Sequence, residues 1–95
     1  MRQAIKSSYL GPTNSRGGRV RATCDAGSKT TPWDHALDAP ENHARAVLAL
    51  CEKLGWDPRY YLGGGIGDGY VWVDARSGVP YLPALANPAR KKQAR

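Results

Sequence analysis

Residues 38–55 read DAPENHARAVLALCEKLG and predict one amphipathic helix with both of its ends marked. Asp38 can cap the first turn, and Glu41, three residues later, completes a capping box. Gly55 supplies the left-handed residue that commonly ends a helix. Between these ends, apolar residues recur at the spacing of one helical face, namely Ala44, Val47, Leu48, Leu50, Cys51 and Leu54. The stretch therefore predicts a helix over residues 39–54 that packs an apolar stripe against a second layer.

The opposite side of this predicted helix is polar, with Asn42, Arg45, Glu52 and Lys53 facing solvent. Leu48 belongs to the predicted stripe. A carboxylate buried there without a partner would be strongly destabilising, so we expect Leu48→Asp to unfold the domain.

The segments on both sides of the helix predict β-strands. Three candidate strands precede it, at residues 3–9, 19–24 and 29–33, and two follow it, at residues 59–62 and 70–74. Residues 19–24 alternate, with Val20, Ala22 and Cys24 on one face and Arg19, Arg21 and Thr23 on the other. Pro32 favours an edge position for the third strand. We predict a two-layer α+β fold, a small antiparallel sheet of order βββαββ with the helix on one face.

Length and composition are those of one small globular domain. The chain has 95 residues, of which 41% are hydrophobic and 23% charged, and no apolar run is long enough to span a membrane. We predict a domain over residues 1–83 and a basic, disordered tail over residues 84–95. The first residues lack the apolar core of a secretory signal. We therefore expect a cytoplasmic protein in which Cys24 and Cys51 are buried, reduced thiols.

The net charge of +6 is unevenly distributed along the chain. Residues 1–33 hold six basic side chains and one acid, residues 34–85 hold four basic side chains and seven acids, and residues 86–95 hold four basic side chains and no acid. Basic ends around a mildly acidic middle indicate a polyanion or an acidic protein surface as partner, or simply a solvated, soluble surface.

The glycine-rich stretch over residues 63–69, GGGIGDG, superficially resembles a phosphate-binding loop. Such loops lead from a strand directly into the N-terminus of a helix. Here the glycines lead into a predicted strand, and no lysine follows at Walker spacing. We interpret the stretch as a hairpin connection.

Asp34, His35, Asp38 and His43 form the one cluster of acid–base or metal-type side chains. Their spacing matches no ligand pattern, and we expect His43 to pack half-buried beside the helix stripe. No catalytic residue, metal or cofactor is assigned. A metal- or thiol-dependent enzyme remains a weaker hypothesis, which requires Asp34, His35 and His43 to converge.

The second face of the sheet carries the stronger functional signal. If Val71 and Val73 face the helix, then Tyr70 and Trp72 join Arg19 and Arg21 on the open face, and Arg16 extends from a basic loop. Rings stack on bases and guanidinium groups contact phosphates in modules that hold single-stranded nucleic acid. We therefore predict nucleic-acid binding through Arg16, Arg19, Arg21, Tyr70 and Trp72. A protein-binding surface, or an aromatic–arginine cluster with no ligand, remains open.

Six phrases resemble a family of small proteins that phages, plasmids and other mobile elements of bacteria encode. They lie at residues 9–17 (YLGPTNSRG), 26–28, 32–37 (PWDHAL), 42–43, 49–56 (ALCEKLGW) and 69–73 (GYVWV), so that the pattern covers residues 3–74. The resemblance implies an accessory protein of a mobile element in a bacterial cytoplasm, and it supplies no catalytic residues.

This context suggests two non-enzymatic functions. One is a nucleic-acid-binding module used in replication or transfer of the element. The other is an inhibitor of a host defence system, anti-CRISPR-like, that covers the surface of a host protein complex. Nucleic-acid binding should weaken steeply with salt, whereas an inhibitor needs a defined protein partner. The oligomeric state is left open.

Overall fold

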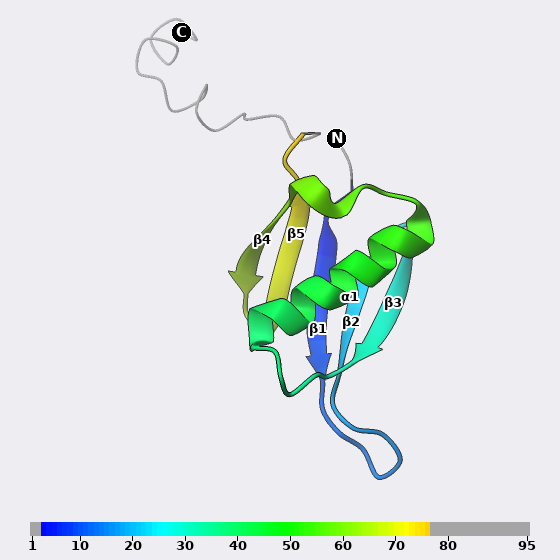
Figure 1. Cartoon of the computed structure of the whole chain (residues 1–95), viewed down its shortest axis with the longest axis vertical. Coiled ribbons are helices and arrows are strands. Elements are labelled where there is room, and N and C mark those ends of the chain that lie inside the picture. The colour runs from blue at the N-terminus through cyan, green and yellow to red at the C-terminus, as the bar shows by residue number, and fades with distance from the viewer. Residues whose placement is uncertain (1–2, 77–95) are drawn as a thin grey trace, which may run out of the picture.

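The computed structural model describes residues 3–76 and shows one helix lying across one face of an antiparallel sheet (Figure 1). The strand order is β3-β2-β1-β5-β4. The elements are β1 (Ile5–Leu10), β2 (Arg19–Cys24), β3 (Gly27–Pro32), α1 (Ala39–Leu54), a 3-10 turn (Pro58–Tyr60), β4 (Tyr61–Ile66) and β5 (Gly69–Asp74). The predicted two-layer α+β fold and the order βββαββ are confirmed. The predicted boundary at residue 83 and the tail at 84–95 lie outside the described residues.

The ends of α1 are formed by the residues that the sequence predicts. The Asp38 carboxylate accepts the Glu41 N–H at 2.9 Å, and Oε1 of Glu41 accepts the Asp38 N–H at 3.4 Å. Gly55 ends the helix with φ 73°, in the left-handed region that glycine adopts without strain. The capping box and the glycine stop therefore define a 16-residue helix.

The face that α1 buries differs from the predicted stripe. Its buried residues are Asn42, His43, Ala46, Val47, Leu50 and Cys51. Leu48 is 43% exposed, so the expectation that Leu48→Asp places a charge beneath the helix is wrong. The predicted solvent side is also wrong for Asn42, which is 1% exposed. The helix is rotated toward His43 and Ala46 because Asn42 and His43 find hydrogen-bond partners inside the protein. The periodicity of apolar residues does not reveal such partners.

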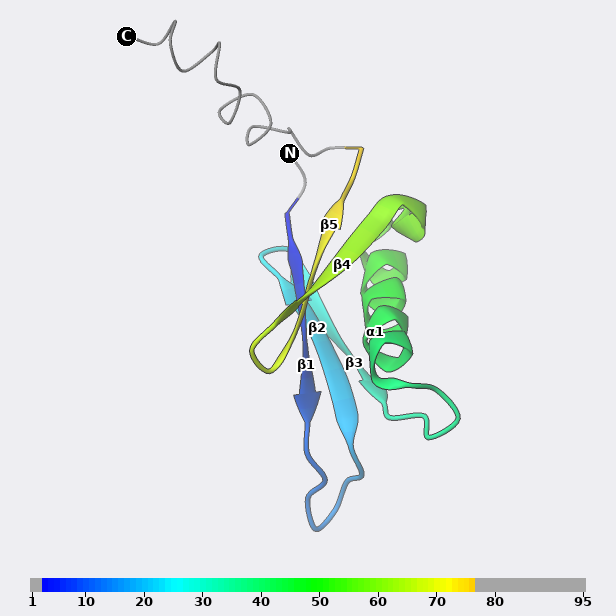
Figure 2. The same ribbon diagram turned by 90° about the vertical axis from the view of Figure 1, so that its left-hand side faces the viewer.

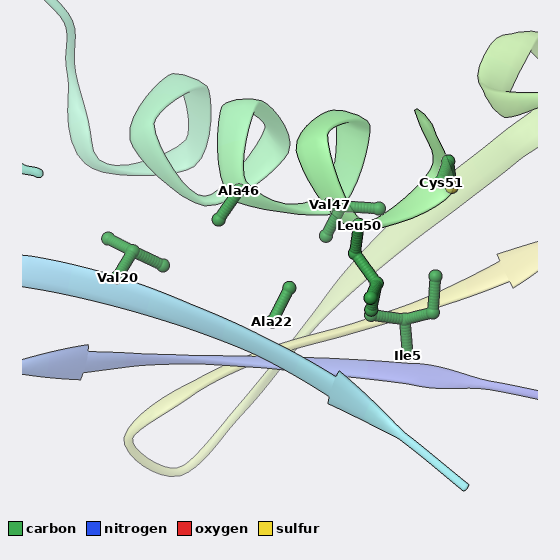
Figure 3. Packing of buried hydrophobic residues seen from close by; sticks show 7 residues of the cluster. All are labelled: Ile5, Val20, Ala22, Ala46, Val47, Leu50 and Cys51. Atoms are coloured by element: carbon green, nitrogen blue, oxygen red, sulfur yellow. The ribbon is translucent and has the colours of Figure 1, made fainter. Parts of the chain in front are cut away.

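The core is small and lies between α1 and the strands β1 and β2 (Figure 3). Ile5 of β1 and Val20 and Ala22 of β2 meet the helix residues Ala46, Val47, Leu50 and Cys51, all at most 3% exposed. The α1 helix lies mainly over β3, β2 and β1, so β5 and β4 are poorly covered on the helix side. Cys24 and Cys51 are not joined by a disulfide; Cys51 is buried as predicted, whereas Cys24 is only half-buried.

The glycine-rich stretch is a strand over most of its length, which corrects the predicted loop. Gly63, Gly64 and Gly65 pair with Trp72, Val71 and Tyr70 of β5, and the connection is the two-residue turn Gly67–Asp68. The interpretation as a hairpin is confirmed, but its first strand runs over Tyr61–Ile66 and not over the predicted residues 59–62. Within residues 3–76, no helix has both the length and the apolar character that crossing a membrane requires.

Candidate nucleic-acid interface

The sheet has one face under α1 and one open face (Figure 2). On β2 the predicted alternation is confirmed. Val20 and Ala22 are fully buried under the helix, while Arg21 and Thr23 are exposed and Arg19 is half-buried on the opposite face. The arginines of the predicted site therefore lie on the open face.

Tyr70 and Trp72 lie on the helix side, so their predicted place beside the arginines is wrong. Trp72 is paired with Ile5 and Tyr70 with Ser7, and both β1 residues are 0% exposed beneath α1. Directly paired residues of antiparallel strands point to the same face of the sheet. It follows that Val71 and Val73, not the aromatic residues, lie on the open face. The alternation of residues 70–73 is compatible with either orientation, and the register with β1 decides between them.

Tyr70 and Trp72 instead belong to a buried polar and aromatic network. The indole Nε1 of Trp72 donates to Ser7 Oγ at 2.9 Å, and Ser7 Oγ lies 2.7 Å from His43 Nδ1. An indole N–H can only donate, so the serine hydroxyl accepts from Trp72. The hydrogen between Ser7 Oγ and His43 Nδ1 lies on the hydroxyl in one tautomer of the histidine and on the ring nitrogen in the other. Burial lowers the pKa of His43 and thereby favours its neutral ring. The ring of Tyr70 meets His43 edge-on, with 4.7 Å between centroids.

A basic patch, formed by Lys6, Arg19 and Arg21, occupies β1 and β2 on the open face. Arg21 is paired with Ser8 on β1, and its Nη2 lies 3.4 Å from Ser28 Oγ on β3. The Nε of Arg19 is buried and makes no hydrogen bond within residues 3–76. No open-face position of the five strands carries a carboxylate.

Ion pairing leaves the basic patch largely uncompensated. Lys6 lies 3.7 Å from Asp68, and both side chains are well exposed, so the pair contributes little. Within the described part of the chain, no ion pair involves Arg16, Arg19 or Arg21. These three arginines therefore remain available to an anionic ligand.

Arg16 lies in the loop that joins β1 to β2 and projects beyond the sheet (Figure 2). The loop is folded into a turn, in which the Thr13 N–H donates to the Arg16 carbonyl at 2.7 Å and the Arg16 N–H donates to Thr13 Oγ1 at 3.1 Å. Arg16 and Arg19 consequently belong to the same end of the sheet, with Arg21 and Lys6 successively farther along it.

An apolar strip adjoins the basic patch on the open face and was not predicted from the sequence. Leu62 is 63% exposed, Val73 44% and Ile66 42%, all on β4 and β5. Leu62 and Val73 are directly paired. The strip escaped prediction because residues 63–69 were interpreted as a loop and Val73 was assigned to the core. The strip would have been predicted if Val71 and Val73, on a strand of strong β-propensity, had been placed on the open face instead of under the helix.

The helix side carries two hollows where α1 does not cover the sheet. The larger, of about 500 Å³, is mostly apolar and includes Leu48, Tyr61 and Trp72 in its lining. The second, of about 440 Å³, lies by the β4–β5 turn and includes His43 and Tyr70. Both hollows contain aromatic side chains predicted to lie on the other face.

The residues of the enzyme hypothesis do not converge on a site. The Asp34 carboxylate accepts the Ala36 N–H at 2.9 Å and pairs with Arg45 at 3.5 Å, while His43 is turned inward to Ser7. In the described ranges of the chain, no three His, Cys, Asp or Glu side chains are grouped so as to hold a metal ion. Comparison of the chain with protein-family models, curated proteins and solved structures found no match.

Proposed function

We propose that this protein is a non-enzymatic module that binds nucleic acid through the basic patch and the loop that carries Arg16. The observation that supports it best is a set of arginines that form no ion pair within residues 3–76 and lie where no described strand position of the open face carries a carboxylate: Arg19 and Arg21, with Arg16 beyond the sheet end. Guanidinium groups suit phosphate oxygens because their planar fork can donate two hydrogen bonds. The resemblance to proteins of mobile elements supplies a context in which nucleic acid is handled.

The mode of binding that we propose differs from stacking on bases. Tyr70 and Trp72 point away from the open face, so the five strands offer cations and hydroxyl groups to the phosphate backbone but no aromatic ring to the bases on that face. Backbone contacts position a nucleic acid without reading its sequence. We expect weak sequence preference and a salt dependence of about −2 to −4 in log K against log salt, for three or four neutralised phosphates.

The test is the binding of fluorescent single- and double-stranded oligonucleotides over a salt series. The double variant Arg19→Gln/Arg21→Gln should bind at least about tenfold more weakly, with a shallower salt slope. The matched control is Arg59→Gln/Arg76→Gln, which removes the same charge next to Asp57, at the far end of the hairpin. If both double variants lost the same affinity, the effect would come from net charge and not from the basic patch. If the wild type did not bind at low salt, the proposal would be refuted.

A second candidate, a protein inhibitor of a host defence system, is favoured by the apolar strip beside the basic patch. Protein interfaces combine a desolvated apolar centre with a polar rim. Val73→Gln should then weaken binding to a purified defence complex and leave oligonucleotide binding unchanged, whereas Arg19→Gln/Arg21→Gln should affect oligonucleotides most.

A further inference from the structure

The free edge of β4 lacks the features that usually prevent edge strands from pairing with other chains. It lies at one end of the strand order (Figure 1), and its six residues, YLGGGI, include no charge and no proline. Natural edge strands are commonly protected by charges, prolines or bulges. The opposite edge, β3, has such protection in Lys29 and Pro32. Among residues 3–76, the edge of β4 is therefore the one that is open to a further strand.

The backbone groups that β4 offers are on Gly63 and Gly65. The Ala75 N–H donates to the Tyr60 carbonyl at 2.9 Å, which makes Tyr60 and Ala75 a hydrogen-bonded pair of this antiparallel hairpin. Such pairs alternate along a strand. Leu62 and Gly64 thus bond to β5, whereas Gly63 and Gly65 turn their N–H and C=O groups outward. Within residues 3–76, these outward groups have no hydrogen-bond partner.

Contacts among residues 3–76 explain one of the three glycines and leave two without a reason. A Cβ on Gly63 would lie 2.5 Å from the Trp72 ring, so Gly63 is required by its own partner. A Cβ on Gly64 or Gly65 would meet nothing within 4 Å, and neither residue has a positive φ. Glycine inside a strand is destabilising and often marks a close approach of another backbone. Gly64 and Gly65 therefore point to something outside the described fold.

We propose that β4 pairs antiparallel with β4 of a second copy of this chain, with Gly64 on the two-fold axis. In this register Gly63 faces the partner's Gly65, and their outward groups make two hydrogen bonds on each side of the axis. The Trp72 ring that covers Gly63 then meets a residue with no side chain, which explains Gly65. On the open face, Leu62 packs beside the partner's Ile66, twice by symmetry.

This dimer is closed and free of repulsion at its centre. The strand carries no charged side chain, so the two copies do not oppose each other there despite the net charge of +6. Because β3 is protected, pairing ends at two copies and does not continue into a fibre. The result is one ten-stranded sheet that joins the two apolar strips and places a basic patch on each flank. The proposal does not depend on nucleic-acid binding.

The first experiment measures the mass of the full chain by multi-angle light scattering from nanomolar to high micromolar concentration. The wild type should approach the dimer mass as concentration rises, and Gly65→Lys, which has room for its side chain in the monomer, should keep the monomer mass. Gly11→Lys is the matched control: it adds the same charge at a loop glycine with equally open surroundings, and it should behave as the wild type. A wild type that remains monomeric at every concentration would overturn the proposal, as would a dimer that Gly65→Lys leaves intact.

A covalent test is independent of affinity. In a Cys24→Ser background, Gly64→Cys places two thiols across the axis at a non-hydrogen-bonded pair, where a disulfide fits. Mild oxidation should convert it to a covalent dimer at least about tenfold faster than Gly17→Cys, a loop position with nothing near its Cβ. Equal rates would show that Gly64 is not at an interface, and hydrogen-exchange protection of Gly63 and Gly65 in a monomer would assign the edge to residues 77–95 instead.

Discussion

His43 shows how a polar side chain becomes part of a small core. It is 4% exposed, and its Nδ1 is hydrogen-bonded to the hydroxyl of Ser7, which accepts from Trp72. The side chains of Trp72, Ser7 and His43 are hydrogen-bonded in series, so the three polar groups lie beneath the helix with partners. The network links α1, β1 and β5 and fixes the orientation of Trp72.

Asn42, one residue earlier, is also buried, and it forms hydrogen bonds with the backbone of the segment that precedes α1. Its Oδ1 accepts the Asp34 N–H at 2.8 Å, and its Nδ2 lies within hydrogen-bonding distance of the carbonyls of Asp34, Leu37 and Asp38. A turn without regular structure thereby obtains partners for its buried backbone groups.

We predict that stability falls on acidification through the titration of His43. Its folded pKa is lowered by burial, so the unfolded state binds a proton more readily, and the contribution of the neutral ring is lost as pH falls below the ordinary value of 6.5 toward the lower folded value. Urea unfolding of the wild type and His43→Gln should show a difference in free energy that shrinks between about pH 7.5 and pH 5. A constant difference would contradict the prediction.

The carboxyl group of Asp57 does not interfere with that measurement. The hydrogen bond from the Arg59 side chain holds its pKa at about 2, below the ordinary 3.8. The stability that this carboxylate contributes is therefore present above pH 3.8 and is lost only as the pH falls toward about 2. The two groups titrate in separate ranges of pH.

At the scale of elements, the length of α1 is set by the residues that cap its ends, and its rotation about its own axis is set by its buried polar residues. Its bounds follow from local chemistry, the capping box and the glycine stop, which are visible in the sequence. Its rotation is decided by hydrogen-bond partners outside the helix, because Ser7 bonds to the buried His43 and the backbone at Asp34 bonds to the buried Asn42.

Two leucines of α1 test this rotation. Leu50 is 0% exposed and Leu48 43% exposed. Leu50→Ala should lower the free energy of unfolding by about 2–4 kcal/mol through the lost burial and the cavity. Leu48→Ala should cost less than about 1 kcal/mol, because its side chain borders an open groove. Chemical denaturation of both variants measures the contrast, and similar losses would restore the face predicted from periodicity.

At the scale of the whole molecule, a single helix cannot cover five strands. It lies on β1, β2 and β3, and the large side chains of β4 and β5 fill part of the remaining helix side, with Trp72 over Gly63. The open face carries a basic patch on β1 and β2 and an apolar strip on β4 and β5. The nucleic-acid proposal rests on the patch and the protein-binding proposal on the strip.

The orientation of β5 can be tested by truncating neighbours on opposite faces. Trp72→Ala removes an indole that hydrogen-bonds to Ser7 and packs against the core, and should cost about 3 kcal/mol of the free energy of unfolding. Val73→Ala, on the open face, should cost less than about 1 kcal/mol. Thermal or urea unfolding compares them, and the reverse order would return Trp72 to the open face.

The sequence by itself determined the elements whose signals are local. The helix and its ends, the strand over residues 19–24 with its inward and outward sides, and the α+β class follow from caps, turn residues and alternation between neighbours in the chain. Tertiary structure alone decided which face of β5 is buried, how α1 is rotated, and that three glycines form a strand. These depend on cross-strand register and on buried hydrogen bonds between residues as far apart as Ser7 and Trp72. The physical reason is that a strand with bulky residues at every position fits a sheet equally well in two orientations, and only the packing against the rest of the fold gives one of them the lower free energy.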